Sequence, residues 1–160
     1  MLAYFRWLED LPLSTSIAGS DELYGFALVL VLHTVGIALT AGSATVMSLR
    51  VLGVGKPFPL ASLRTLFKFF WVGFIGNAVT GTLLFMMAAT STGYKPMYYV
   101  KLVCLLLGVL TLLRLRRVIE HDPSQELAGD PRRGLTAVAI LCLVFWAGVI
   151  TSGRLLAYTK

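Results

Sequence analysis

The chain has 160 residues, of which 57% are hydrophobic and 14% charged, and its formal net charge at pH 7 is +6. A soluble domain contains about 45–50% apolar and about 25% charged residues, and a chain of this size leaves roughly a third of its unfolded surface exposed after folding. The composition therefore excludes a soluble domain and a disordered chain, and it predicts a small integral membrane protein with a single domain, residues 1–160.

Residues 1–20 do not form a secretory signal sequence, because charged residues and a proline interrupt every apolar run. Apolar side chains instead recur at helical spacing, at Leu2, Phe5, Leu8 and Leu11. This spacing predicts a short amphipathic helix, which either lies in the membrane interface or packs as a cap on the rest of the protein.

Four apolar segments follow, each near the roughly 20 residues that a helix needs to cross a bilayer. They cover about residues 23–49, 69–89, 96–113 and 135–158. We expect an all-α fold, an integral membrane four-helix up-down-up-down bundle with a short N-terminal interfacial helix. Aromatic residues near the segment ends are interpreted as belts at the two membrane surfaces. The inner belt consists of Phe67, Phe69, Phe70 and Trp71.

Lysine and arginine are more frequent in the first and third loops than in the second loop and the two terminal segments. The richer set is Arg50, Lys56, Arg64, Lys68, Arg114, Arg116, Arg117, Arg132 and Arg133. Cytoplasmic loops carry such an excess, so we expect a bacterial inner (plasma) membrane protein with both termini periplasmic or extracellular. Attraction of these basic residues to the lipid bilayer explains the positive net charge, so no nucleic acid is expected as a partner.

His33 is the main candidate for a functional residue. It lies about ten residues into the first apolar segment, or about 15 Å deep at 1.5 Å per residue, which is near the expected midplane. An ionisable residue at this depth is a functional hypothesis by default. Three interpretations stay open: a hydrogen bond across the bundle to Asn77 or Thr80, an axial ligand to haem or another metal, and a contact to a quinone or a proton-transfer step.

Asn77 and Thr80 lie near the middle of the second segment, at the expected depth of His33. Their amide and hydroxyl can bond between helices or line a ligand site, and packing is the favoured role. Arg154 and Lys101 are expected near the outer surface, where cations bind haem propionates or lipid phosphates or anchor a helix in the interface.

A haem b bound at His33 would be held by that histidine alone, by a methionine as well, or by a ligand from another subunit. The reason is that the other histidine, His121, is expected in a loop. Met86 and Met87 lie nearer the outer end of their segment than the midplane, which makes them imperfect partners. The residues therefore leave the cofactor unknown, with His33, Asn77, Thr80 and Arg154 as candidate contacts and His33 as the candidate metal ligand.

The sequence has no phosphate-binding loop, dinucleotide fingerprint, nucleophile elbow or zinc-protease motif, so we expect no enzymatic activity. Three stretches carry a resemblance, namely residues 32–43 with 49–53, residues 80–85, and residues 98–102. Together they resemble a family of small bacterial four-helix membrane proteins of unknown function, and more distantly the membrane domain of copper-resistance proteins of the CopD type. The resemblance covers roughly residues 20–118, and it implies the four-span fold and attention to His33.

The favoured function is a non-enzymatic membrane subunit or anchor that works with a membrane protein partner or as a homo-oligomer. The alternative is a haem- or quinone-binding electron-transfer subunit that uses His33. A second alternative, implied by the resemblance, is a membrane protein that handles copper.

Overall fold

The structure is a computed structural model that describes residues 2–19, 25–54, 62–121 and 133–158. Within these ranges the chain is helical, with turns and no strand. The helices are α1 (Leu2–Glu9), α2 (Pro12–Ala18), α3 (Phe26–Val51), α4 (Ser62–Met87), α5 (Ala89–Thr92), α6 (Pro96–His121) and α7 (Arg133–Leu155).

Four helices, α3, α4, α6 and α7, are long and apolar enough to cross a membrane, which confirms the number of long segments expected from the sequence. Two of them extend well beyond the apolar segments: α4 begins at Ser62 rather than near residue 69, and α6 continues past residue 113 to His121. Lysine and arginine favour helix, so a helix does not end where its apolar run ends. His121 is accordingly the last residue of α6 and not a loop residue.

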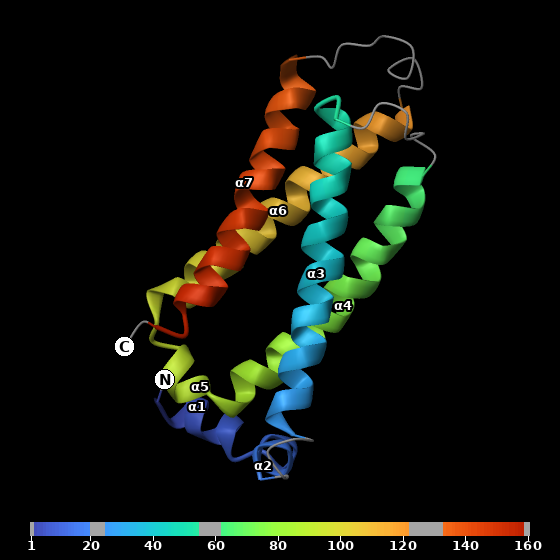
Figure 1. Ribbon diagram of the computed structural model, residues 1–160. Coiled ribbons are helices and arrows are strands. Elements are labelled where there is room, and N and C mark those ends of the chain that lie inside the picture. The colour runs from blue at the N-terminus through green and yellow to red at the C-terminus, as the bar shows by residue number, and fades with distance from the viewer. Residues whose placement is uncertain (1, 20–24, 55–61, 122–132, 159–160) are drawn as a thin grey trace.

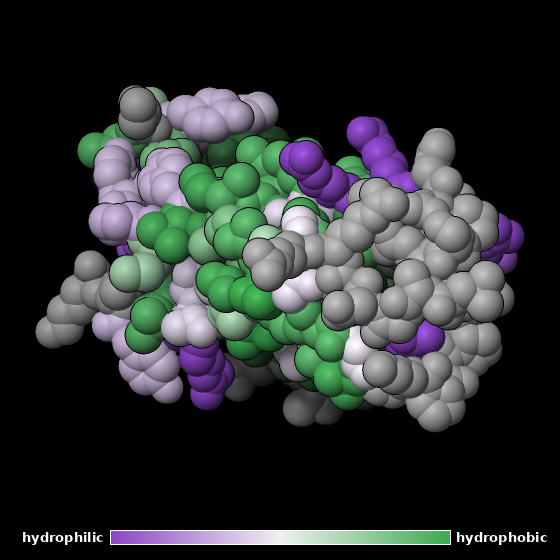
Figure 2. Space-filling model, turned by 90° about the horizontal axis from the view of Figure 1, so that it is seen from above, coloured by the Kyte–Doolittle hydropathy of each residue, from purple (hydrophilic) through white to green (hydrophobic). Residues whose placement is uncertain are grey.

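All four long helices keep large hydrophobic side chains on the outside of the molecule. Examples from the four helices are Leu32, Val72, Leu106 and Val144, each about half exposed or more. In Figure 2 apolar residues (green) occupy much of the middle of the visible face, and strongly hydrophilic side chains (purple) stand at several places around them. A surface of this kind is favourable against hydrocarbon and unfavourable against water.

The long helices are arranged as two packed pairs (Figure 1). Helix α3 packs along α4 and α6 packs along α7, while α7 also packs against α3 and so joins the pairs. The core lies where they join, around Phe70, Leu112, Cys142 and Trp146. The expected inner aromatic belt is wrong for Phe67 and Phe70, which are 7% and 0% exposed and belong to this core. Spacing along one helix does not say which aromatic rings a neighbouring helix covers.

Two glycines allow α3 and α4 to approach closely. A Cβ placed on Gly73 would lie 2.7 Å from Leu39 Cβ and 2.9 Å from the Gly36 carbonyl oxygen. A Cβ on Gly36 would in turn lie 3.2 Å from the Gly73 carbonyl oxygen. Small residues at such a crossing are the usual way for helices to pack in membranes.

The N-terminal helix packs against the protein as a cap, one of the two arrangements expected from its spacing. Helix α1 contacts α4 and α5, and both the amide and the hydroxyl of Thr90 donate to Glu9 Oε1, at 2.8 and 2.6 Å. The Phe5 ring packs edge-on against Phe85 and Tyr94. The pKa of Glu9 is lowered, first by the Thr90 hydroxyl, then by the Thr90 amide and, to a smaller extent, by Arg6.

We predict that Gly73→Ala destabilises the protein by about 1–3 kcal/mol, because its methyl group would push α3 and α4 apart. Gly76→Ala on the same helix is the matched control, since a Cβ there meets nothing within 4 Å. The control should be neutral or stabilising by up to about 1 kcal/mol, through helix propensity. Thermal unfolding in detergent measures both variants, and equal melting temperatures would contradict the close crossing.

We predict that the docking of α1 weakens at acid pH. A carboxyl whose pKa is lowered by folding stabilises the folded state above its unfolded pKa of about 4.3, and this contribution is lost as the pH falls through the lowered value. Hydrogen exchange of α1, corrected for the intrinsic effect of pH, should rise toward that of Glu9→Ala as the pH falls. Asp10→Ala is the control, and acid-insensitive protection of α1 would contradict the role of Glu9.

Candidate functional site

His33 lies on the interior face of α3, nearer one end of the helix than its middle. The buried residues Val29, Gly36 and Thr40 share this face, and His33 itself is partly buried. The helix begins at Phe26, so His33 is roughly 10 Å from its start at about 1.5 Å per residue. His33 thus lies between the start of α3 and its middle, and its position at the membrane midplane stays a prediction.

A hydrogen bond joins His33 to α4, which is one of the three interpretations that the sequence leaves open. His33 Nδ1 lies 2.9 Å from Thr80 Oγ1. The Thr80 hydroxyl also lies 2.7 Å from the Gly76 carbonyl oxygen. Two oxygens at that distance need a proton between them, so the single hydroxyl proton of Thr80 goes to Gly76, which favours Thr80 as an acceptor toward a proton on His33 Nδ1.

The position of the ring proton determines what the other ring nitrogen can do. An uncharged imidazole carries one proton, on Nδ1 or on Nε2. With the proton on Nδ1, Nε2 has a free lone pair, which can accept a hydrogen bond or bind a metal ion. Among the described residues, Nε2 has no hydrogen-bond partner.

Asn77 bonds the backbone of α3. Its amide satisfies both atoms when the nitrogen faces the His33 carbonyl oxygen at 2.7 Å and the oxygen faces the Ile37 amide nitrogen at 2.9 Å. The reverse orientation would set acceptor against acceptor and donor against donor. In this orientation the Asn77 nitrogen also donates to His33 Nδ1 at 3.2 Å, so Asn77 favours a lone pair on Nδ1, whereas the shorter contact with Thr80 favours a proton there. Asn77 therefore fixes α3 at His33, and Thr80 fixes the ring.

Gly81 provides the space for the imidazole. A Cβ on Gly81 would lie 3.1 Å from His33 Cε1 and 3.7 Å from Nδ1. The ring thus rests against the backbone of α4, one turn away from Asn77. The sequence indicated Gly81 only as a small residue suited to helix packing, and not as the residue that makes space for the imidazole.

Lys101, for which the sequence favours interfacial anchoring, is partly buried on α6. Its side chain lies along α7, with Cδ, Cε and Nζ 3.7–3.8 Å from where a Gly153 Cβ would be. Lys101 therefore belongs to the α6–α7 pair, whereas His33 belongs to the α3–α4 pair. A lysine in one apolar segment and a small residue in the next are too weak a sequence signal to predict this packing of Lys101 along α7.

The structure does not bring Arg154 into this group. Its side chain is exposed in the last turn of α7. The described residues also contain no group of three or more His, Cys, Asp or Glu side chains that could hold a metal ion. A metal at His33 would thus receive fewer than three ligands of these four types from the described part of the chain.

We predict that nitrogen-15 magnetic resonance of labelled histidine shows His33 protonated on Nδ1 and unprotonated on Nε2. His121→Gln leaves His33 as the only histidine signal. Thr80→Val removes the acceptor, so the Nε2-protonated form should increase in that variant. A wild-type spectrum with the proton on Nε2 would contradict the hydrogen-bond assignment.

The comparison with known protein families gives one match, a family model described as a family of unknown function (DUF6644), over residues 4–159. No curated protein matches the chain, and no solved structure matches it. Nothing in these comparisons links the chain to copper-resistance proteins of the CopD type. The match extends across the N-terminal cap and all four long helices, and the chain belongs to this family of unknown function.

Proposed function

We propose that the protein is a non-enzymatic, multi-pass subunit of the bacterial inner membrane that binds a lipophilic ligand, a quinone or a haem, at His33. The observation that carries this proposal is a histidine on the interior face of a long apolar helix whose Nδ1 is bonded to Thr80 and whose Nε2 has no hydrogen-bond partner among the described residues. Of the functions expected from the sequence, this joins the membrane subunit to the electron-transfer alternative.

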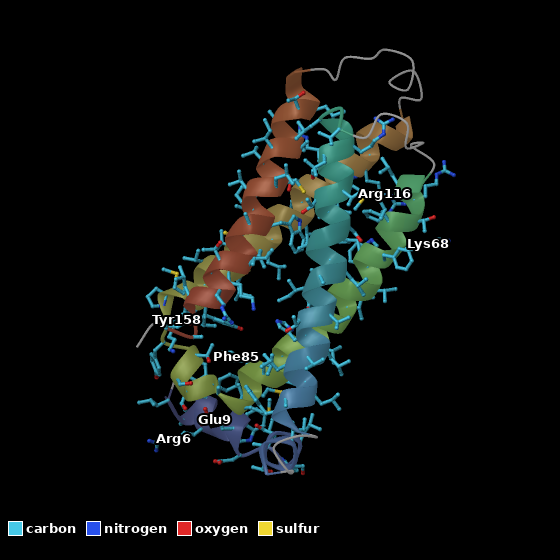
Figure 3. All side chains as sticks on the ribbon, in the orientation of Figure 1. Arg6, Glu9, Lys68, Phe85, Arg116 and Tyr158 are labelled. Carbon is cyan, nitrogen blue, oxygen red and sulfur yellow. The ribbon has the colours of Figure 1, made fainter. Side chains whose placement is uncertain are left out.

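The four long helices are proposed to cross the membrane as an up-down-up-down bundle, with both termini outside the cytoplasm. Figure 3 supports this orientation, because Lys68 and Arg116 lie at the end of the molecule opposite Glu9. Basic residues gather on the cytoplasmic side of membrane proteins. A reporter fused to the C-terminus tests the orientation, and a reporter found in the cytoplasm would overturn it.

A ligand at His33 would remove the energetic cost of an unsatisfied polar atom in the membrane. In the hydrocarbon region no water satisfies polar atoms, and each unsatisfied group costs several kcal/mol. A packing role for His33 uses Nδ1 and leaves Nε2 without a partner among the described residues. A hydroxyl group can form a hydrogen bond with this nitrogen, and a haem iron can coordinate it. Either group can be carried by a lipophilic molecule that dissolves in the membrane.

Met86 and Met87 do not provide a second ligand for a haem at His33. They are partly buried in the last turn of α4, and roughly 10 Å of helix separates them from Thr80 at about 1.5 Å per residue. A haem would therefore be held by His33 alone or share a ligand from another subunit. The exposed apolar faces of the long helices leave room for lipid and for a membrane protein partner or a second copy.

We predict that the protein purified from membranes contains either haem, seen as a Soret band, or quinone, found by organic extraction. His33→Ala should lose the ligand, because Nε2 is its contact, and His121→Ala is the matched control that keeps it. If the wild type carries neither and binds neither when they are added, the ligand proposal is wrong and a plain membrane anchor remains.

A further inference from the structure

Two lysine side chains meet the end of α7 from the start of α6. Lys95 Nζ donates to the Leu156 carbonyl oxygen at 3.2 Å. Lys101 Nζ lies 3.8 Å from where a Gly153 Cβ would be. The Leu156 amide still bonds the Ser152 carbonyl oxygen, so helical spacing reaches Leu156, and residues three apart are neighbours on one side of a helix. Both ammonium groups therefore approach α7 within about one helical turn.

Most of the hydrogen-bond donors of these two groups have no partner among the described residues. An ammonium group has three donors and no acceptor. Lys95 uses one donor on Leu156, whereas Lys101 has neither a hydrogen bond nor an ion pair in the described part of the chain. Lys101 is also partly buried in a helix long and apolar enough to cross a membrane. A cation in this position generally has an anion or an acceptor as its partner.

The described carboxylates do not supply this anion. The acidic residues whose side chains the structure describes are Glu9 and Asp10, at the end of α1. Glu9 is bonded to Thr90 through the amide and the hydroxyl. A partner for the lysine pair therefore has to come from outside the described chain.

This end of the molecule has the side chains typical of a membrane surface. Figure 1 shows the start of α6 and the end of α7 together at the end where α1 lies. Tyr94, Tyr99 and Tyr158 are each more than half exposed there. Tyrosine is enriched at the level of the lipid headgroups, and the negative charge of a phospholipid is at the same level, on its phosphate.

Apolar side chains extend from the lysine pair along the outside of both helices. Leu102 and Leu106 on α6 are 42% and 61% exposed, and Leu155 on α7 is 43% exposed. These side chains can contact acyl chains of a lipid whose headgroup lies at the lysines. A phosphate group carries several acceptor oxygens, so it can accept from both ammonium groups at once.

We propose that Lys95 and Lys101 form a binding site for one phosphate group, that of an anionic phospholipid, at the end of α7. The phosphate oxygens accept from the two ammonium groups, and the acyl chains lie along α6 and α7. A free phosphate ion offers the same oxygens but lacks the chains. The inference rests on the proposed crossing of the membrane and is independent of the ligand at His33.

The test is native mass spectrometry of the purified full-length chain in detergent, titrated with dioleoyl phosphatidylglycerol or with zwitterionic dioleoyl phosphatidylcholine. The wild type should bind phosphatidylglycerol at least about fivefold more tightly, since choline opposes the charge of its own phosphate. Lys101→Met should weaken phosphatidylglycerol binding about ten- to a hundredfold, because it removes a charged donor and keeps the length of the side chain. Lys95→Met should weaken it about tenfold.

Arg154→Met is the matched control. Arg154 is exposed in the last turn of α7, so its loss removes the same charge at the same end of the protein. Phosphatidylglycerol affinity should fall by no more than about fivefold, the effect of one charge near a membrane surface. Melting temperatures establish that each variant is folded. If Lys101→Met does not fold, Gly153→Leu, which keeps both lysines but occupies the space over which Lys101 lies, should weaken binding in its place.

Inorganic phosphate distinguishes the two sources of the ligand. Phosphatidylglycerol binding that inorganic phosphate does not displace supports the lipid as the occupant. Binding of inorganic phosphate that Lys101→Met abolishes, without a preference between the two lipids, supports the phosphate site and assigns it to a soluble ion. Equal losses in Lys101→Met and Arg154→Met, or equal affinity of Lys101→Met and wild type, overturn the site.

The outcomes also separate this site from the proposed ligand of His33. A protein that carries haem or quinone, lost in His33→Ala, but binds neither phosphatidylglycerol selectively nor inorganic phosphate overturns the lysine site alone. A protein that binds phosphatidylglycerol through Lys101 and carries neither haem nor quinone supports the lysine site and overturns the ligand at His33.

Discussion

The contact between Gly36 and Gly73 is the constraint on which the rest of the α3–α4 pair depends. The two backbones come so close that a Cβ on either residue would overlap the opposite helix. Only at this separation can the Asn77 amide reach the α3 backbone and the Thr80 hydroxyl reach the His33 ring. In a bilayer, where the hydrophobic effect does not drive helices together, such close packing and the interhelical hydrogen bonds that it permits hold the pair.

A second constraint is that the pairs join at their core and not along their whole length. Phe70 and Trp146 meet edge-on there, and Ala44, Leu112 and Cys142 complete the packing. Toward the other end, aromatic rings take over, with Phe85 stacked on Tyr98 and Phe5 against Phe85. The core and the capped end are therefore held by different sets of side chains, the first from α3, α4, α6 and α7 and the second from α1, α4 and α6.

The sequence was sufficient for properties that depend on one helix at a time. Length and composition predicted the four long apolar helices, and counting residues placed Thr80 beside His33. It was insufficient where two helices decide the result. Phe67 and Phe70 belong to the core that Trp146 of α7 completes, with Trp146 edge-on against Phe70, and Lys101 lies along α7 beside Gly153. Neither neighbour can be identified without knowing how α7 packs against the other helices.

The same distinction bears on how much can be concluded from a histidine in a membrane helix. A hydrogen bond to a threonine could equally belong to a structural residue, so His33 bonded to Thr80 says little by itself. The informative atom is the Gly76 carbonyl oxygen, which takes the threonine proton and so makes the hydroxyl an acceptor. The Asn77 nitrogen, which donates to the same Nδ1 at 3.2 Å, favours the opposite state. Only with the proton on Nδ1 can Nε2 receive a hydroxyl proton or bind iron, so the position of this proton distinguishes a structural histidine from one that binds a ligand.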